Sequence, residues 1–335
     1  MEFADLGSSG VKVSKLCLGT WAMGGWMWGG TDEAEAIRTI HSALDRGVNF
    51  IDTAPVYGFG RSEEIVGKAL AERGKRDQVV LATKVGLEWK KDESIFRNSS
   101  PPRIRQEIED SLKRLQTSYI DLYQVHWPDT AVPIQETART LLELQKEGKI
   151  RAIGVSNYSP EQMDEFRKAA PITTVQPPYN LFERERERDV LPYAKKSGIS
   201  ILAYGAICRG LLSGKMRPEK KFKDDDLRAH DPKFQEPRYS QYLKAVDELS
   251  KFAAKRYGKP VLALALRWVL DQGGIALWGA RNQHQLDPIE DVLGWSMDSA
   301  AMAEIDRILA RAILDPVGPE FMAPPVRASA VGGAI

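Results

Sequence analysis

The chain has 335 residues, of which 43% are hydrophobic and 28% are charged. This composition is typical of a globular protein and excludes collagen-like, coiled-coil and intrinsically disordered chains. Lys and Arg number 47 and Asp and Glu number 46, so the formal net charge of +1 provides no general field that attracts nucleic acid or acidic membranes. We therefore expect a small-molecule partner, with no nucleic acid and no membrane.

Targeting and metal signals are missing from the sequence. Residues 1–5 have neither the basic start nor the apolar core of a signal peptide, and no apolar run approaches the roughly 18 residues of a membrane span. The cysteines Cys17 and Cys208 form no CxxC pair, and the four histidines form no HExxH motif. We expect a cytoplasmic protein without a metal, as a monomer or small homo-oligomer.

Along the chain, a helical stretch, a glycine and a short apolar run follow one another repeatedly. After Thr31, a predicted N-cap, apolar residues fall on one helical face, Gly47 ends the helix, and 48–51 is a predicted strand. The other predicted strands cover 16–18, 79–82, 120–125, 150–155, 173–175, 199–203 and 275–278. Sequential strands joined by helices must be parallel, so the pattern predicts a (β/α)8 TIM barrel.

The remaining segments complete one predicted domain over 1–335. Residues before Leu16 are expected to form a β-hairpin that closes the barrel bottom, and extra C-terminal helices precede a tail over about 312–335. A doubly wound sheet is the competing fold, but Gly58–Glu63 lacks the third glycine of the dinucleotide fingerprint. A long loop over about 207–238 is expected to be functional, and mobile without its ligand.

Ionisable residues follow three consecutive predicted strands. Asp52, Lys84 and His126 stand at strand ends, and Tyr57 lies in the loop after Asp52. Because barrel chemistry is located at the carboxyl ends of strands, these side chains are expected to meet. Asp52 should pair with Lys84, and a positive Lys84 would lower the pKa of Tyr57. Tyr57 would then protonate a carbonyl oxygen that His126 orients, while another agent supplies hydride.

Four stretches of the sequence carry a family resemblance. They are Phe50–Gly58, Thr83-Lys84, Asp121–Asp129 and Ile153–Asn157. With them the chain resembles the aldo-keto reductase superfamily, and 176–180 and 315–322 resemble its bacterial general-stress branch. The resemblance implies a catalytic tetrad of Asp52, Tyr57, Lys84 and His126, with NADPH as hydride donor and no metal.

The same resemblance implies the cofactor contacts. Besides Asp52, the implied residues are Ser156, Asn157 and Gln176 at the nicotinamide carboxamide, Tyr204 stacked on the ring, and Gly19, Thr20 and Trp21 near the ribose. The long loop, with Arg209, Gly210, Leu212 and Lys215, resembles a strap over the pyrophosphate. At the adenine end Gly279, Arg281 and Gln285 depart from the better-known family pattern. Arg281 can hold a 2′-phosphate, so we favour NADPH, with NADH possible in principle.

Aromatic residues in the loops after the strands predict a substrate pocket for partly apolar aldehydes or ketones. The predicted lining is Trp21, Trp28, Tyr57, Trp89, His126 and Trp127. Two other functions stay open. Lys84 could form a Schiff base in a barrel aldolase, or the chain could be a cofactor-sensing regulatory subunit related to potassium-channel β subunits.

Overall fold

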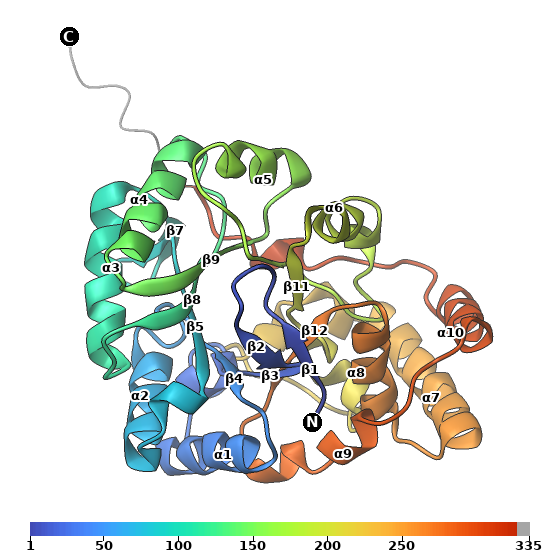
Figure 1. Ribbon diagram of the computed structural model, residues 1–335. Coiled ribbons are helices and arrows are strands. Elements are labelled where there is room, and N and C mark those ends of the chain that lie inside the picture. The colour runs from blue at the N-terminus through green and yellow to red at the C-terminus, as the bar shows by residue number, and fades with distance from the viewer. Residues whose placement is uncertain (327–335) are drawn as a thin grey trace.

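The computed structural model describes residues 1–326, which form a barrel surrounded by helices (Figure 1). Its strands are β3 (Leu16–Gly19), β4 (Phe50–Asp52), β5 (Val80–Val85), β8 (Ile120–Val125), β9 (Ile150–Ser156), β10 (Thr174–Gln176), β11 (Ser200–Ala203) and β12 (Ile275–Gly279). Each strand pairs in parallel with the next, and β12 closes the barrel on β3, with Gly279 opposite Gly19. The predicted (β/α)8 barrel is confirmed.

Ten α-helices cover the outside of the barrel or follow it. They are α1 (Glu33–Asp45), α2 (Arg61–Arg73), α3 (Pro101–Arg114), α4 (Ile134–Lys146), α5 (Pro160–Arg167), α6 (Val190–Ser197), α7 (Arg238–Tyr257), α8 (Val261–Asp271), α9 (Ile289–Val292) and α10 (Ser299–Ala312), counted within 1–326. The N-cap of α1 is Asp32, which accepts a hydrogen bond from the backbone of Glu35, so the prediction of Thr31 is wrong by one residue. None of the helices in residues 1–326 is long and apolar enough to cross a membrane.

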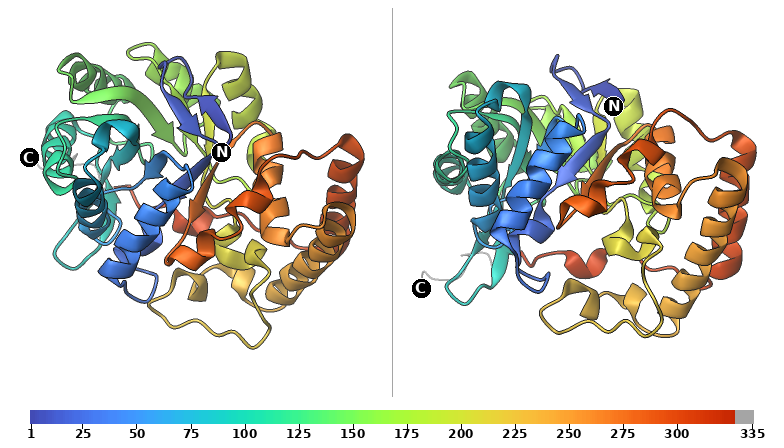
Figure 2. Two further views of the ribbon diagram at one scale, coloured as in Figure 1. Left: turned by 60° about the horizontal axis from the view of Figure 1, so that its bottom comes forward. Right: turned by 90° about the horizontal axis from the view of Figure 1, so that it is seen from below.

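The predicted N-terminal hairpin consists of β1 (Phe3–Asp5) and β2 (Lys12–Ser14), which pair in antiparallel fashion. It crosses one end of the barrel (Figures 1 and 2). Leu6 and Val13 are fully buried and pack against residues of the barrel interior, among them Phe50 and Leu122. These apolar contacts close the amino end of the barrel and leave the carboxyl end for a site.

A second hairpin was not predicted from the sequence. It follows β5 and consists of β6 (Leu87–Trp89) and β7 (Ile95–Arg97). Most of its residues are half-buried, so the alternation of buried and exposed positions is too weak to indicate strands. The chain returns to this hairpin near its end, where Val326 bridges to Arg97 in parallel. The rest of the predicted tail, 327–335, lies outside the described residues.

Short 3-10 helices occupy the connections. They are η1 (Trp21–Gly24), η2 (Arg76–Gln78), η3 (Glu185–Glu187), η4 (Cys208–Ser213), η5 (Leu227–Ala229), η6 (Pro232–Phe234), η7 (Gln283–Leu286) and η8 (Glu320–Met322). Three of them lie in the long loop after β11, at the carboxyl end of the barrel and opposite the N-terminal hairpin (Figure 2).

Buried charges hold the long loop at both of its ends. Arg209 donates to Glu183 and Asp231, both at 2.5 Å, and Lys233 lies 2.9 Å from Glu183, with all four side chains at most 3% exposed. Leu211 and other apolar residues of the loop are also buried. The loop thus has more buried surface than its composition indicates, and we restrict the expectation of mobility to the mostly exposed residues 217–225.

Candidate active site

Three adjacent strands bring the predicted tetrad together. Asp52 ends β4, Lys84 lies near the end of β5, and His126 follows β8 directly. Lys84 Nζ donates to Asp52 Oδ1 at 2.5 Å, to Thr53 O at 2.9 Å and to Tyr57 Oη at 3.3 Å. The Tyr57 and His126 rings meet edge to face, with centroids 5.8 Å apart. All three protons of the ammonium group are therefore used, one each on the carboxylate, the backbone carbonyl of Thr53 and the phenol.

Two glutamines hold the other oxygen of Asp52. Gln124 Nε2 and Gln176 Nε2 each donate to Asp52 Oδ2 at 3.0 Å. Gln176 is among the predicted residues, whereas Gln124 is not. The sequence holds a signal for Gln124, because it lies two residues before His126 and two residues after apolar Leu122, and therefore on the same face of the strand as both. A carboxylate that is 2% exposed thus has donors for both oxygens.

The electrostatics differ from the sequence prediction at Tyr57. Burial raises the pKa of Tyr57 more than the positive charge of Lys84 lowers it, so the net shift is upward. Burial also acts to lower the pKa of Lys84, but Asp52 and Tyr57 outweigh it and raise that pKa. Burial and the charge of Lys84 together place the pKa of His126 well below its ordinary value. At neutral pH the site holds a protonated phenol, an ammonium and a neutral imidazole.

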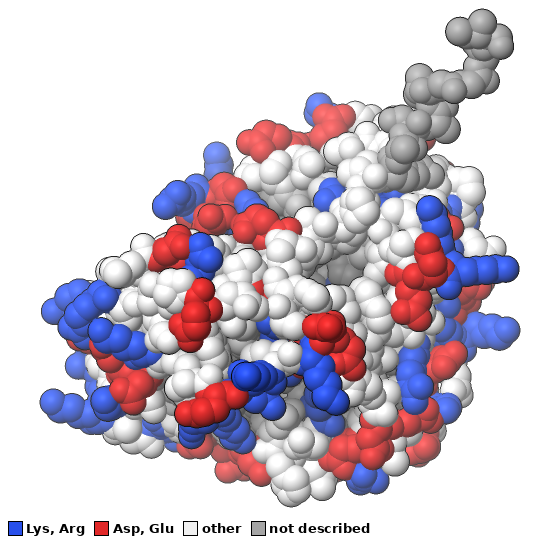
Figure 3. Space-filling model, turned by 180° about the vertical axis from the view of Figure 1, so that it is seen from behind, with Lys and Arg blue, Asp and Glu red and all other residues white. Residues whose placement is uncertain are grey.

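An apolar cavity of about 290 Å³ opens above Tyr57 and His126. The residues around it include Trp21, Trp26, Met27, Val56, Leu87, Ile95, Trp127, Leu227, His230, Phe321, Met322, Pro324 and Pro325. Figure 3 shows the molecule from this side, with a hollow near the centre and acidic and basic side chains intermixed around it. Trp26 and the C-terminal residues of the wall are not among the predicted pocket residues. Trp26 lies in the same loop after β3 as Trp21, so its position in the sequence could have indicated it, whereas only the fold brings the C-terminal residues to the barrel mouth.

Two of the predicted pocket residues do not line this cavity. Trp28 packs edge to face against Trp21, with centroids 5.5 Å apart, and the guanidinium of Arg228 lies 5.4 Å from the ring of Trp28. Trp89 packs on Phe59 at 5.7 Å. Both positions follow barrel strands, but these rings pack against other loop residues and are not part of the cavity lining.

The residues expected at the nicotinamide lie together on one side of the cavity. Ser156, Asn157, Gln176 and Tyr204 all line it. Tyr204 Oη donates to Asn157 Oδ1 at 3.0 Å, and Asn157 Nδ2 donates to His126 O at 3.0 Å. Gln176 Oε1 has no partner among residues 1–326 and offers an acceptor for an amide N–H. An acceptor and a flat aromatic ring fit a carboxamide on an aromatic cofactor.

On the expected ribose side, Thr20 has another partner. Its hydroxyl donates to Asp52 O at 3.1 Å and accepts from Ser62 Oγ at 2.8 Å, and the residue is fully buried. Thr20 therefore fixes the ends of β3 and β4 instead of offering a free side chain. Gly19 ends β3, and Trp21 stacks on Tyr57 with centroids 5.9 Å apart.

Of the charged residues predicted to contact the pyrophosphate, Arg209 is paired with carboxylates and Lys215 is exposed. The guanidinium of Arg209 is buried against Glu183 and Asp231, so the expected contact of its side chain with phosphate is not supported. The backbone amides of Gly210 and Leu212 both donate to Ile207 O, at 3.0 and 3.2 Å. Lys215 is exposed and has no ion pair within residues 1–326, so it is the member of this set whose charge is available.

At the predicted adenine end, Arg281 follows β12 and Gly279. Its Nη1 donates to Trp28 O and its Nη2 to Gly30 O, both at 2.7 Å, while its backbone N–H donates to Gln285 Oε1 at 2.7 Å. Because a guanidinium has five donors, these contacts leave it able to bind an anion. Gln285 supports Arg281 in this structure.

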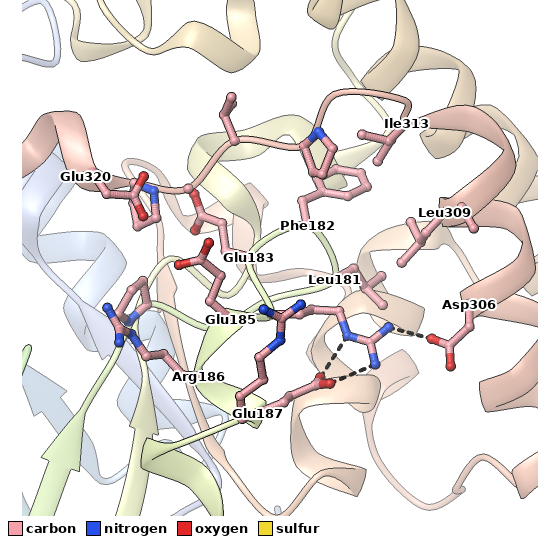
Figure 4. A pocket seen from close by; sticks show the side chains of 18 residues that line it. Leu181, Phe182, Glu183, Glu185, Arg186, Glu187, Asp306, Leu309, Ile313 and Glu320 are labelled. Atoms are coloured by element: carbon pink, nitrogen blue, oxygen red, sulfur yellow. Dashed lines mark hydrogen bonds and ion pairs between the residues drawn. The ribbon is translucent and has the colours of Figure 1, made fainter. Parts of the chain in front are cut away.

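A larger cavity of about 600 Å³ lies outside the tetrad (Figure 4). It is bounded by the segment after β10 and by α10 with the chain that follows it. Arg184 reaches from one side to Asp306 on the other and also binds Glu187 at 2.7 Å. Charges of both signs line this cavity, so its chemistry selects no ligand of one charge. Among residues 1–326, no group of three or more His, Cys, Asp or Glu side chains can hold a metal ion.

At the carboxyl ends of an eight-stranded barrel, an Asp, a Lys and a Tyr are joined by hydrogen bonds, and a neutral His lies beside them. This arrangement defines a class of oxidoreductase that acts on carbonyl groups with a nicotinamide cofactor. The chain belongs to the aldo/keto reductase family, whose model matches residues 15–310. This confirms the family resemblance and makes the protein an NAD(P)H-dependent oxidoreductase.

Bacterial members of the family are similar to this chain over most of its length. Aldo-keto reductase YhdN from Bacillus subtilis is 60% identical, over 98% of this chain and 99% of its own. The NADH-specific methylglyoxal reductase of Escherichia coli is 37% identical to this chain, and the match covers 82% of this chain and 87% of the reductase. The solved structure of the glycerol dehydrogenase AKR11B4 from Gluconobacter oxydans matches this protein with a TM-score of 0.85 and 57% sequence identity. The match covers 93% of this chain and 96% of the chain of the dehydrogenase.

Proposed function

We propose that the protein reduces aldehydes and ketones to alcohols reversibly, with NADPH as the favoured cofactor and Tyr57 as proton donor. The observation that carries this proposal is the hydrogen-bonded series Asp52–Lys84–Tyr57 at the floor of an apolar cavity. When bound, the cofactor supplies hydride to the carbonyl carbon.

The residues of the chain supply the proton and the orientation. The phenol of Tyr57 keeps its proton until the carbonyl oxygen gains negative charge, because burial raises its pKa. Lys84 then stabilises the phenolate that remains, since its ammonium lies 3.3 Å from Tyr57 Oη. Neutral His126 has one N–H, which can donate to the same carbonyl oxygen. Asp52, held by Gln124 and Gln176, keeps the ammonium in place.

The cavity indicates the substrate class. A volume of about 290 Å³ with indole, thioether and proline walls fits a small to medium carbonyl compound with an apolar or flat part. The names of two relatives, a methylglyoxal reductase and a glycerol dehydrogenase, support small substrates with oxygen functions. The proposal includes a monomer or small homo-oligomer in the cytoplasm, where Cys17 and Cys208, both buried free thiols, stay reduced.

Replacing Tyr57 tests the proposed mechanism. We expect Tyr57→Phe to lower kcat for carbonyl reduction at least about 100-fold, because general acid catalysis contributes on the order of 10²–10⁴-fold. The Kd for NADPH, measured by quenching of tryptophan fluorescence, should change little, since the hydroxyl is bonded to Lys84. Turnover above about a tenth of the wild-type value would be incompatible with Tyr57 as the acid.

The cofactor preference rests on Arg281. We expect Arg281→Ala to weaken NADPH binding by about 1.5–3 kcal/mol, the range for a hydrogen-bonded charged group, and to weaken NADH binding much less. Binding titrations with both cofactors measure the difference. His284→Ala is the matched control, because this neighbouring side chain is 79% exposed. If Arg281→Ala weakens the binding of NADPH and NADH equally, Arg281 does not bind the 2′-phosphate.

The alternative functions gain no support from the site. A Schiff-base aldolase needs a neutral Lys84, but this amine is fully buried, donates to three oxygens and has a raised pKa. A regulatory cofactor sensor predicts tight binding with slow turnover, so the kinetic measurements above also test that function.

A further inference from the structure

Arg97, the last residue of β7, joins separate segments around the apolar cavity. Its Nε donates to Pro324 O at 2.9 Å, and its backbone N–H donates to Pro325 O at 3.0 Å. Its Nη1 donates to Pro128 O at 2.9 Å, and its guanidinium lies 5.2 Å from the ring centre of Trp127. One residue outside the tetrad thus contacts both the C-terminal segment and the loop after β8.

The C-terminal segment receives its long-range hydrogen bonds from Arg97, while the ring of Phe321 also lies 5.9 Å from the guanidinium of Arg209. Phe321, Met322, Pro324 and Pro325 form one wall of the cavity. Inside the segment, Met322 and Ala323 donate only to Pro319 and Glu320. Among residues 1–326, the hydrogen bonds that join 319–326 to the rest of the molecule are the two from Arg97. Since proline has no N–H, 324–325 can only accept, and Arg97 supplies the donors.

We propose that Arg97 is a positioning residue that determines substrate specificity by holding the C-terminal wall against Trp127. This inference rests on the proposed carbonyl reduction. A flat or bulky apolar carbonyl compound needs the wall, because its apolar part fills the space between Trp127 and Phe321 and loses these contacts when the wall moves away. A three-carbon carbonyl compound reaches the tetrad with few such contacts. Arg97 therefore favours the larger substrate over the smaller one.

Kinetics with two probe substrates, benzaldehyde and methylglyoxal, test this role. In Arg97→Ala we expect KM for benzaldehyde to rise about tenfold more than KM for methylglyoxal, in the range for a lost apolar contact. Arg97→Lys should show most of the same effect, because one ammonium cannot reproduce a fork that spans two carbonyls. Arg105→Ala, which removes an exposed ion-pairing arginine of α3, is the matched control and should leave the ratio unchanged. An unchanged ratio in both Arg97 variants would overturn the proposal.

A double-mutant cycle separates positioning from a general loss of stability. If Arg97 acts through the wall, Phe321→Ala should change the same KM ratio, and the double variant should show less than the product of the two single effects. Independent, multiplicative effects would contradict the proposal.

Amide hydrogen exchange provides a readout without turnover. We expect Arg97→Ala and Arg97→Lys to speed exchange at Met322 and Ala323 at least tenfold, with little change in α3, whereas equal exchange to the wild type would contradict the inference. If the wild-type protein reduces neither aldehyde, the proposed function fails, while the exchange experiment still decides whether Arg97 holds the wall.

Discussion

Tyr57 owes its chemistry to the balance of two opposing effects on one phenol. Burial raises the pKa of Tyr57, and the ammonium of Lys84 acts in the other direction but is outweighed. A proton donor for carbonyl reduction must be protonated before the reaction and stabilised as an anion after it. Burial meets the first need and Lys84 the second. His126 remains neutral for similar reasons, since burial and the charge of Lys84 both disfavour its cationic form.

These shifts predict a pH profile. Because the pKa of His126 lies well below 6.5 and that of Tyr57 lies above 10, neither group changes charge between pH 7 and 9. We expect kcat/KM for carbonyl reduction to be flat over this range and to fall as Tyr57 loses its proton at higher pH. A profile of initial rates at saturating NADPH measures this. An inflection near pH 6.5–8 that disappears in a His126 variant would contradict a neutral, buried His126.

Among the elements, the loop after β11 shows how a polar segment is held in place. Its ends are joined to the segment after β10 by Arg209, Lys233, Glu183 and Asp231, and Lys233 Nζ also donates to Gly318 O at 3.0 Å. Two positive and two negative charges are buried together, so each has an opposite partner. Three segments far apart in the sequence are thereby fixed around the barrel mouth.

Removal of one carboxylate should release this loop. We expect Glu183→Gln to lower the free energy of unfolding by about 3–5 kcal/mol at pH 7, because two buried cations lose their shared partner. Neighbouring cations lower the pKa of Glu183 from 4.5 to about 2, although burial acts in the opposite direction. The wild-type advantage is therefore complete above pH 4.5 and disappears as the pH falls toward 2.

Urea unfolding of both proteins from pH 7 to pH 3 measures this difference. Glu165→Gln, at an exposed pair with Lys168, is the control and should have little effect. A stability difference between the wild type and Glu183→Gln that does not shrink with acid would contradict the lowered pKa.

In the whole molecule, the contacts of the N-terminal hairpin and the candidate active site lie at opposite ends of the barrel. The N-terminal hairpin closes one end with Leu6 and Val13, whereas the tetrad and the cavity lie at the other end. Changes in the hairpin contacts therefore need not reach the reacting groups.

Leu6→Ala tests this separation. The side chain is fully buried, so we expect a loss of about 2–5 kcal/mol in the free energy of unfolding, with kcat nearly unchanged at a temperature where the variant is folded. Phe3→Ala is the control, since Phe3 is 46% exposed. Urea unfolding and initial rates measure both quantities. A large loss of kcat in fully folded Leu6→Ala would show that the two ends of the barrel are coupled.

The sequence by itself determined the barrel and the tetrad. Helical periods alternating with short apolar runs predict parallel strands, and strand ends such as Asp52, Lys84 and His126 then meet whatever the details of packing. Of the two glutamines at Asp52, only Gln176 was predicted, because the sequence does not indicate which group a polar residue within a strand will contact.

The tertiary structure decided what depends on burial and on distant segments. It raised the pKa of Tyr57, buried Arg209 between two carboxylates, and left Trp28 and Trp89 outside the lining of the cavity. It also brought Phe321 and its neighbours to the barrel mouth. Desolvation and contacts between residues far apart in the chain are properties of the packed molecule, so no local pattern of the sequence contains them.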